Sequence, residues 1–97
     1  MITAYVELGE VCRLSVDGHA TGSPEVCAGV SAVVYALAGY LTNRVPEAEI
    51  RLDSGRAQIS CRGQRAMFEM AWIGLAQIEK AHPEFIRVEC GRELEAV

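Results

Sequence analysis

The stretch GHATGSPEVCAGVS, residues 18–31, marks the point at which a strand gives way to a long helix. Glycines and a proline end the strand, Ser23 is a favourable N-cap residue, and Pro24 fits the first helical position. The apolar sequence that follows continues until Pro46, which a helix does not pass. The sequence therefore predicts a helix that begins at Pro24 and ends at residue 43 or 44.

Short strands and one further helix are predicted around this first helix. Runs of β-branched and aromatic residues between Gly-containing turns predict strands, and a longer apolar-periodic segment predicts a helix. The predicted strands are Thr3–Leu8, Val11–Asp17, Ile50–Asp53, Arg56–Cys61 and Phe85–Cys90, and the second predicted helix is Gln64–Ala81. The order β-β-α-β-β-α-β favours an α+β fold, a two-layer sandwich of helices on a sheet. The order of the strands within the sheet does not follow from the sequence.

The composition is that of a single domain over residues 1–97. Hydrophobic residues make up 51% of the chain, which is enough for a core without disulfide bonds. A net charge of −4, with nine scattered basic residues, argues against direct nucleic-acid binding. No glycine motif for phosphate or dinucleotide binding is present, so no cofactor is expected.

The cysteines show neither a C-x-x-C pair nor the compact spacing of a disulfide framework. They are Cys12, Cys27, Cys61 and Cys90. The first residues lack the basic and apolar regions of a signal peptide, so we expect free thiols and a cytoplasmic protein. All but Cys27 lie in predicted strands and are interpreted as packing residues. The short ligand spacings of a zinc site are missing, so no metal site is predicted.

The uncharged segment 26–43 reaches the lower length limit of a membrane-spanning helix. Its polar and small residues instead favour a helix buried between a sheet and another helix, so no membrane association is predicted.

Both predicted helices are apolar on two faces, which indicates burial on two faces. In the first helix, Ala28, Ala32 and Ala36 form a stripe of small residues that permits another helix to approach closely. We expect a homodimer that buries this stripe or the region around Trp72. The alternative is that the two helices of one chain cover each other above the sheet.

A histidine and a cysteine flank the loop between the second strand and the first helix. Side chains in a helix tilt toward its N-terminus, so the Cys27 sulfur would point at the unpaired N–H groups of the first turn, which favour a thiolate. His19 is the candidate base, and Ser31 lies one turn after Cys27 on the same face. The N–H groups of the first turn, with that of Cys27, are the candidate oxyanion hole. The alternative is that Cys27 is a small buried hydrophobe and His19 a turn residue.

This region resembles the ribosomal-processing cysteine protease (Prp) family. The resemblance lies in Gly18-His19-Ala20, a glycine-containing loop, and Val26-Cys27-Ala28-Gly29-Val30-Ser31-Ala32. It implies that His19 and Cys27 are the catalytic pair and that Gly18 and Ser31 support them. The family consists of small homodimeric bacterial proteins. The resemblance implies removal of an N-terminal extension from a large-subunit ribosomal protein, or action on a phage capsid or scaffold protein.

Two departures mark the chain as a divergent member. The loop from Ala20 to Val26 is shorter than the family pattern, and Pro24 stands where the family has an aspartate three residues before the cysteine. We expect the loop residues Gly22, Ser23, Pro24 and Glu25 to contact a protein substrate.

The sequence thus predicts a cysteine endopeptidase with Cys27 as nucleophile and His19 as general base. The alternative is a non-catalytic, dimeric binding module associated with the ribosome or a phage particle. The reactivity of the thiol separates them, because a docking surface has no need of an activated thiolate.

Overall fold

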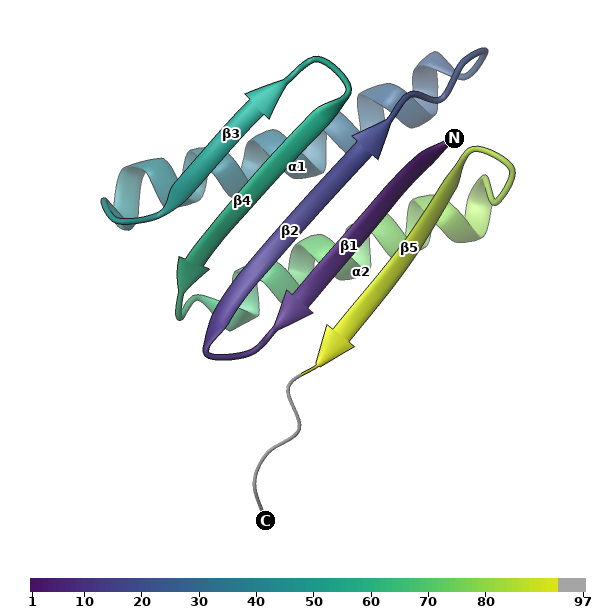
Figure 1. Ribbon diagram of the computed structural model, residues 1–97. Helices are drawn as coiled ribbons and strands as arrows, with labels where there is room; N and C mark the ends of the chain where they lie inside the picture. The colour runs from purple at the N-terminus through teal and green to yellow at the C-terminus, as the bar shows by residue number, and fades with distance from the viewer. Residues whose placement is uncertain (93–97) are drawn as a thin grey trace.

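The computed structural model describes residues 1–92 and contains the predicted elements in the predicted order (Figure 1). They are β1 (Ile2–Leu8), β2 (Val11–Gly18), α1 (Pro24–Arg44), β3 (Glu49–Asp53), β4 (Arg56–Arg62), α2 (Arg65–Ala81) and β5 (Ile86–Arg92). Both helices lie on one face of the sheet, so the two-layer α+β arrangement is confirmed.

The five-stranded sheet has the order β3-β4-β2-β1-β5. Strands β1 and β2, and strands β3 and β4, are antiparallel hairpins. Strand β4 pairs antiparallel with β2, and β5 returns to pair parallel with β1, with Ile2 opposite Ile86. The central strands are therefore β4, β2 and β1, and the edges are β3 and β5.

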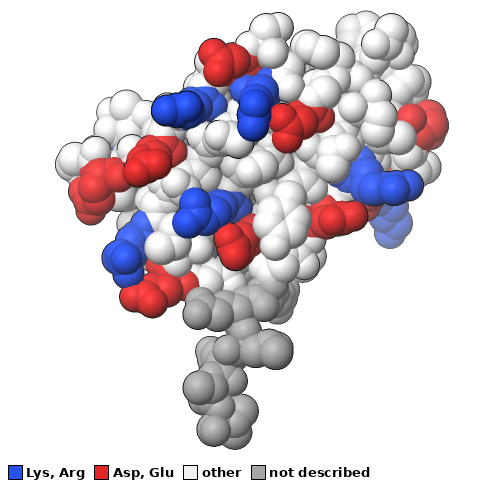
Figure 2. Space-filling model, in the orientation of Figure 1, with Lys and Arg blue, Asp and Glu red and all other residues white. Residues whose placement is uncertain are grey.

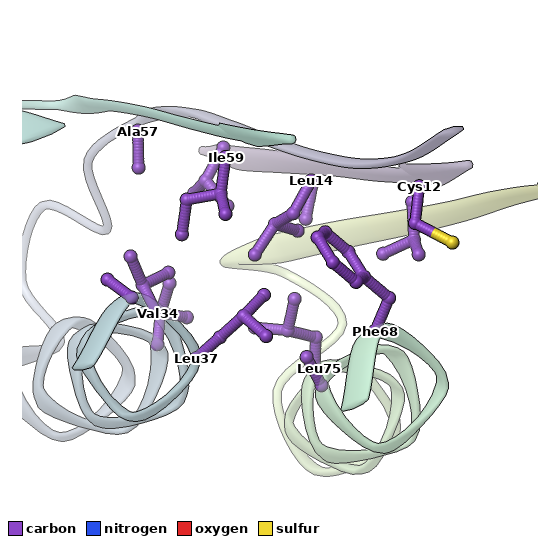
Figure 3. Close-up of a cluster of buried hydrophobic side chains, with 14 of the residues drawn as sticks. Cys12, Leu14, Val34, Leu37, Ala57, Ile59, Phe68 and Leu75 are labelled. Carbon is purple, nitrogen blue, oxygen red and sulfur yellow. The ribbon is translucent and has the colours of Figure 1, made fainter. Parts of the chain in front are cut away.

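The core fills the space between the sheet and the two helices (Figure 3). Alternate residues of the strands point into it, as the pattern of buried and exposed positions in β1 and β4 shows. The helices contribute Leu37 of α1 and Phe68 and Leu75 of α2, which pack against these strand residues from the side opposite the sheet. Phe68 is fully buried and pins α2 to the sheet.

The opposite face of the sheet is open and carries charges of both signs (Figure 2). Cross-strand ion pairs lie on this face, with Arg13 3.3 Å from Glu7 and Arg56 3.5 Å from Asp17. All four side chains are about half exposed, so each pair contributes little to stability.

The apolar character of α1 is explained by its place in the core. By length and composition α1 could cross a membrane, but its residues facing the sheet are buried. These are Val26, Val30, Val34, Leu37, Ala38 and Leu41. A helix that supplies this much of the core of a sandwich needs no membrane to account for its hydropathy.

The alanine stripe of α1 borders an open apolar groove between the helices, where Ala32 and Ala36 lie across from Met67 and Met70 of α2. Its three alanines are exposed, and the helices approach each other at glycines. A Cβ on Gly29 would lie 3.3 Å from Cδ1 of Ile78, and one on Gly74 would lie 3.3 Å from Cγ2 of Val33. The two helices thus cover each other in part, and the stripe remains on the surface.

Candidate active site

Strand β2 ends at Gly18, which turns the chain out of the sheet and presents His19 at its end. The φ of Gly18 is +98°, a conformation that favours glycine, and a Cβ there would collide with the carbonyl oxygen of Met1. The N–H of Gly18 donates to the carbonyl of Gly55 at 2.9 Å, and the main-chain nitrogen of Met1 donates to the carbonyl of His19 at 2.8 Å. The backbone around the exposed His19 is therefore held from two sides.

A single tight turn separates His19 from α1. The N–H of Ser23 donates to the carbonyl of Ala20 at 3.0 Å, and Gly22 has a φ of +88°. A positive φ at the third residue is the mark of a type II turn, which requires glycine there. The Cys27 thiol donates to the carbonyl of Ala20 at 3.7 Å. The short loop thus places the Cys27 sulfur against the residue that follows His19.

The position of the N-cap is confirmed, and one expectation about the first turn of α1 is wrong. Ser23 is the N-cap residue, but its Oγ is buried and makes no hydrogen bond, because the backbone enters the helix with φ −133° and ψ 82°. The N–H of Cys27 already donates to the carbonyl of Ser23 at 3.2 Å, so it is not free for an oxyanion. Among the described residues, the N–H groups of Glu25 and Val26 have no acceptor. These two N–H groups are therefore the donors in the first turn of α1 that are available to bind a negative charge.

His19 and Cys27 line one cleft of about 260 Å³, at the end of the sheet where α1 begins. The cleft also includes Gly18 and Ser31. The four residues singled out from the sequence as catalytic or supporting are therefore brought together. In this conformation the thiol bonds to a carbonyl rather than to the imidazole, and catalytic hydrogen bonds are often long before substrate binds.

The other side of the cleft is the β3–β4 hairpin, which the sequence had not indicated. Leu52, Asp53, Ser54, Gly55, Arg56 and Ala57 all contribute to the lining. The DSG sequence at residues 53–55 predicts only a turn, and no local signal relates it to His19. Its position depends on the pairing of β2 with β4, where Asp17 lies opposite Arg56. Knowledge of the strand order was needed to find it.

The loop residues Gly22, Ser23, Pro24 and Glu25 are not among those that line the cleft. Ser23 is buried and its three neighbours are exposed on the surface of the turn. A role for them in binding substrate stays a prediction.

Two of the three strand cysteines are packing residues, as predicted. Cys12 on β2 and Cys61 on β4 are buried and lie opposite each other in the sheet. Burial raises the pKa of the Cys61 thiol, and the nearby Cys12 and Glu47 raise it further. Cys90 is half-buried against the core. Within residues 1–92, no group of three or more metal-ligating side chains is assembled. Cys27 is thus the cysteine that shares a cleft with a histidine.

Comparison with known proteins identifies the family of the chain. The family model of the cysteine protease Prp matches residues 1–87. The chain belongs to the Prp family of cysteine proteases. A comparison with curated protein sequences finds no match to it.

Three solved structures share the fold. The ribosomal processing protease Prp from S. aureus, in complex with a covalently linked product peptide, superposes with a TM-score of 0.77 at 23% identity. That match covers 93% of this chain and 99% of the other. The same protease with a substrate peptide gives a TM-score of 0.74 at 22% identity, with the same coverage. SMU.848 from Streptococcus mutans gives 0.73 at 22% identity and covers 96% of each chain.

Proposed function

We propose that this Prp-family protease uses Cys27 as nucleophile and His19 as general base to remove an N-terminal extension from a large-subunit ribosomal protein. The observation that carries the proposal is that His19 and Cys27 line the same cleft. The S. aureus relative is described as a ribosomal processing protease and has been crystallised with substrate and product peptides, which supports a peptide substrate of that class.

The proposed chemistry is acyl transfer. The Cys27 thiol leaves the Ala20 carbonyl and gives its proton to the His19 imidazole, and the sulfur attacks the scissile carbonyl carbon. The candidate donors to the oxyanion are the N–H groups of Glu25 and Val26, which have no acceptor among the described residues and which adjoin the cleft residue Cys27 in sequence. The imidazolium then protonates the leaving amine as the C–N bond breaks. Water, deprotonated by His19, then attacks the thioester carbonyl, the C–S bond breaks to release the acid product, and the His19 imidazolium returns the proton to the Cys27 thiolate.

The walls of the cleft suit an extended peptide. Val30 and Val34 of α1 form an apolar floor, and Tyr35 and Leu52 stand at the rim with 62% and 40% of their surface exposed. Apolar side chains of a bound peptide would cover these two residues, which are otherwise unfavourably placed in water.

The test is cleavage by purified protein, with intact mass as the readout. Candidate substrates are large-subunit ribosomal proteins with N-terminal extensions from the same organism, with phage capsid and scaffold proteins as a second set. Cys27→Ala and His19→Ala should each lose nearly all activity, and the double variant little more, because both residues serve one step. Cys61→Ala, a buried cysteine far from the cleft, should retain it.

The possible outcomes distinguish the proposed function from its alternatives. Cleavage that survives Cys27→Ala would refute the assignment of the nucleophile. Cleavage confined to phage proteins would replace the ribosomal substrate with a phage structural protein. Stable binding to a candidate without any cleavage would favour the non-catalytic binding module.

A further inference from the structure

The imidazole of His19 rests on the backbone of Gly55. A Cβ on Gly55 would collide with Nε2 of the ring and would lie 2.9 Å from Cε1 and 3.2 Å from Cδ2. These three atoms form the tip of the imidazole. The tip therefore occupies the space that any side chain at position 55 would need.

The same turn is tied to the backbone just before His19. The carbonyl of Gly55 accepts the N–H of Gly18 at 2.9 Å, so the β3–β4 turn and the end of β2 are linked directly. In Figure 1 this turn and the end of β2 lie at one end of the sheet, beside the start of α1. A change in the turn is thus transmitted to His19 through both its side chain and its backbone.

No hydrogen bond found among the described residues fixes the direction of the imidazole. His19 is also exposed. The contact with Gly55 therefore limits where the ring can lie on that side. Misplacement of a catalytic group by about 1 Å can lower a rate by about 100-fold, so such a restraint matters for catalysis.

We propose that Gly55 is a positioning residue for His19, and that the absence of a side chain at position 55 sets the place of the general base. This inference rests on the proposed function, because it takes His19 as the base that serves Cys27. Gly55 lines the cleft, but its proposed role is exerted through the imidazole of His19 and not through contact with the reacting atoms.

Gly55 also has a φ of +73°, so a turn alone could require glycine there. Gly63, after β4 at the opposite end of that strand, separates the two explanations. Its φ is +78°, and a Cβ on it would meet nothing within 4 Å. Gly55→Ala and Gly63→Ala therefore both place alanine at a similar positive φ, and only the first displaces the imidazole. Gly55→Asn completes the set, because asparagine tolerates positive φ but still carries a Cβ.

We expect Gly55→Ala and Gly55→Asn to lower kcat by about 100-fold with KM changed much less, and Gly63→Ala to stay within about twofold of wild type. Proton NMR measures the chemical shifts of the imidazole protons of the two histidines. The His19 signals are assigned as those that disappear in His19→Ala. The His19 signals should shift in both Gly55 variants and stay in place in Gly63→Ala.

Unchanged His19 signals in Gly55→Ala, or equal losses of kcat in Gly55→Ala and Gly63→Ala, would overturn the positioning role. Failure of the proposed function has a different signature. In that case the wild type cleaves nothing or His19→Ala remains active, while the NMR comparison still reports whether Gly55 places the ring.

Discussion

Replacing Ser23 by alanine should stabilise the protein, although Ser23 occupies an N-cap. Serine at this position normally accepts a hydrogen bond from the helix, and its loss costs about 0.5–2 kcal/mol. Here the side chain is 1% exposed and its Oγ has no partner. A buried hydroxyl without a hydrogen bond costs about 1–3 kcal/mol, and alanine removes that cost.

The cavity left by one oxygen offsets only part of the gain. At about 24 cal/mol per Å³, a void of about 12 Å³ costs roughly 0.3 kcal/mol. The net expectation for Ser23→Ala is therefore an increase in the free energy of unfolding of about 1 kcal/mol. For a domain of this size, that raises Tm by about 4–8 °C.

Urea denaturation followed by circular dichroism gives the free energy, and a thermal melt gives Tm. Ser54→Ala, which removes an exposed hydroxyl from the β3–β4 turn, is the control and should change stability by less than about 0.5 kcal/mol. If Ser23→Ala instead destabilises by about 1 kcal/mol, the hydroxyl caps the helix in solution and the reasoning from its burial is refuted.

Three further predictions follow from the cysteines and the exposed helix face. Cys27 should react first with iodoacetamide near neutral pH, ahead of the half-buried Cys90, as measured by peptide mapping over time; earlier labelling of any other cysteine would contradict an activated thiolate. Burial raises the pKa of Cys61 in the folded protein above the ordinary value of 9.0, so the folded state favours the neutral thiol. The contribution of this thiol to stability is therefore complete below pH 9.0 and is lost as the pH rises further. The urea midpoint should therefore fall less between pH 8 and pH 10 in Cys61→Ala than in wild type. Equal falls in the two proteins would contradict this role of Cys61. Light scattering should give twice the chain mass of 10.5 kDa, because Tyr35 and Met70 leave an apolar surface on the helices; a mass of 10.5 kDa at micromolar concentration excludes a stable homodimer.

The elements of this fold could be predicted because their signals are local. Pro24 and Pro46 bound α1, and alternation along each strand gives the face that is buried. Hairpins follow from short turns between adjacent strands, but alternation does not say which distant strand is the neighbour. The pairings of β2 with β4 and of β1 with β5 therefore had to come from the structure.

The same limit applies to the site. His19 and Cys27 are close in sequence, so strand end, turn and helix start together predicted their proximity. Gly55 lies on a different hairpin and reaches His19 only through the β2–β4 pairing, so no local pattern could reveal it. Ser23 shows a second limit, because residue preference predicted its position but not the direction of its hydroxyl.

The parallel pairing of β1 with β5 has a consequence for the order of folding. Residues 1–62 contain every strand and helix that lines the cleft, yet β1 lacks one of its two neighbours until residues 86–92 return to it. Closing so long a loop is entropically costly, and sheets built on distant pairings fold slowly. During synthesis β1 therefore stays an open edge, available to other strands, until β5 emerges. Once β5 docks, the Glu79 carboxylate accepts the N–H of Val88 at 2.7 Å, so the new edge is itself partly closed as it forms. Met1 donates to the carbonyl of His19 and directly precedes β1, so the docking of β5 on β1 also supports the backbone at His19.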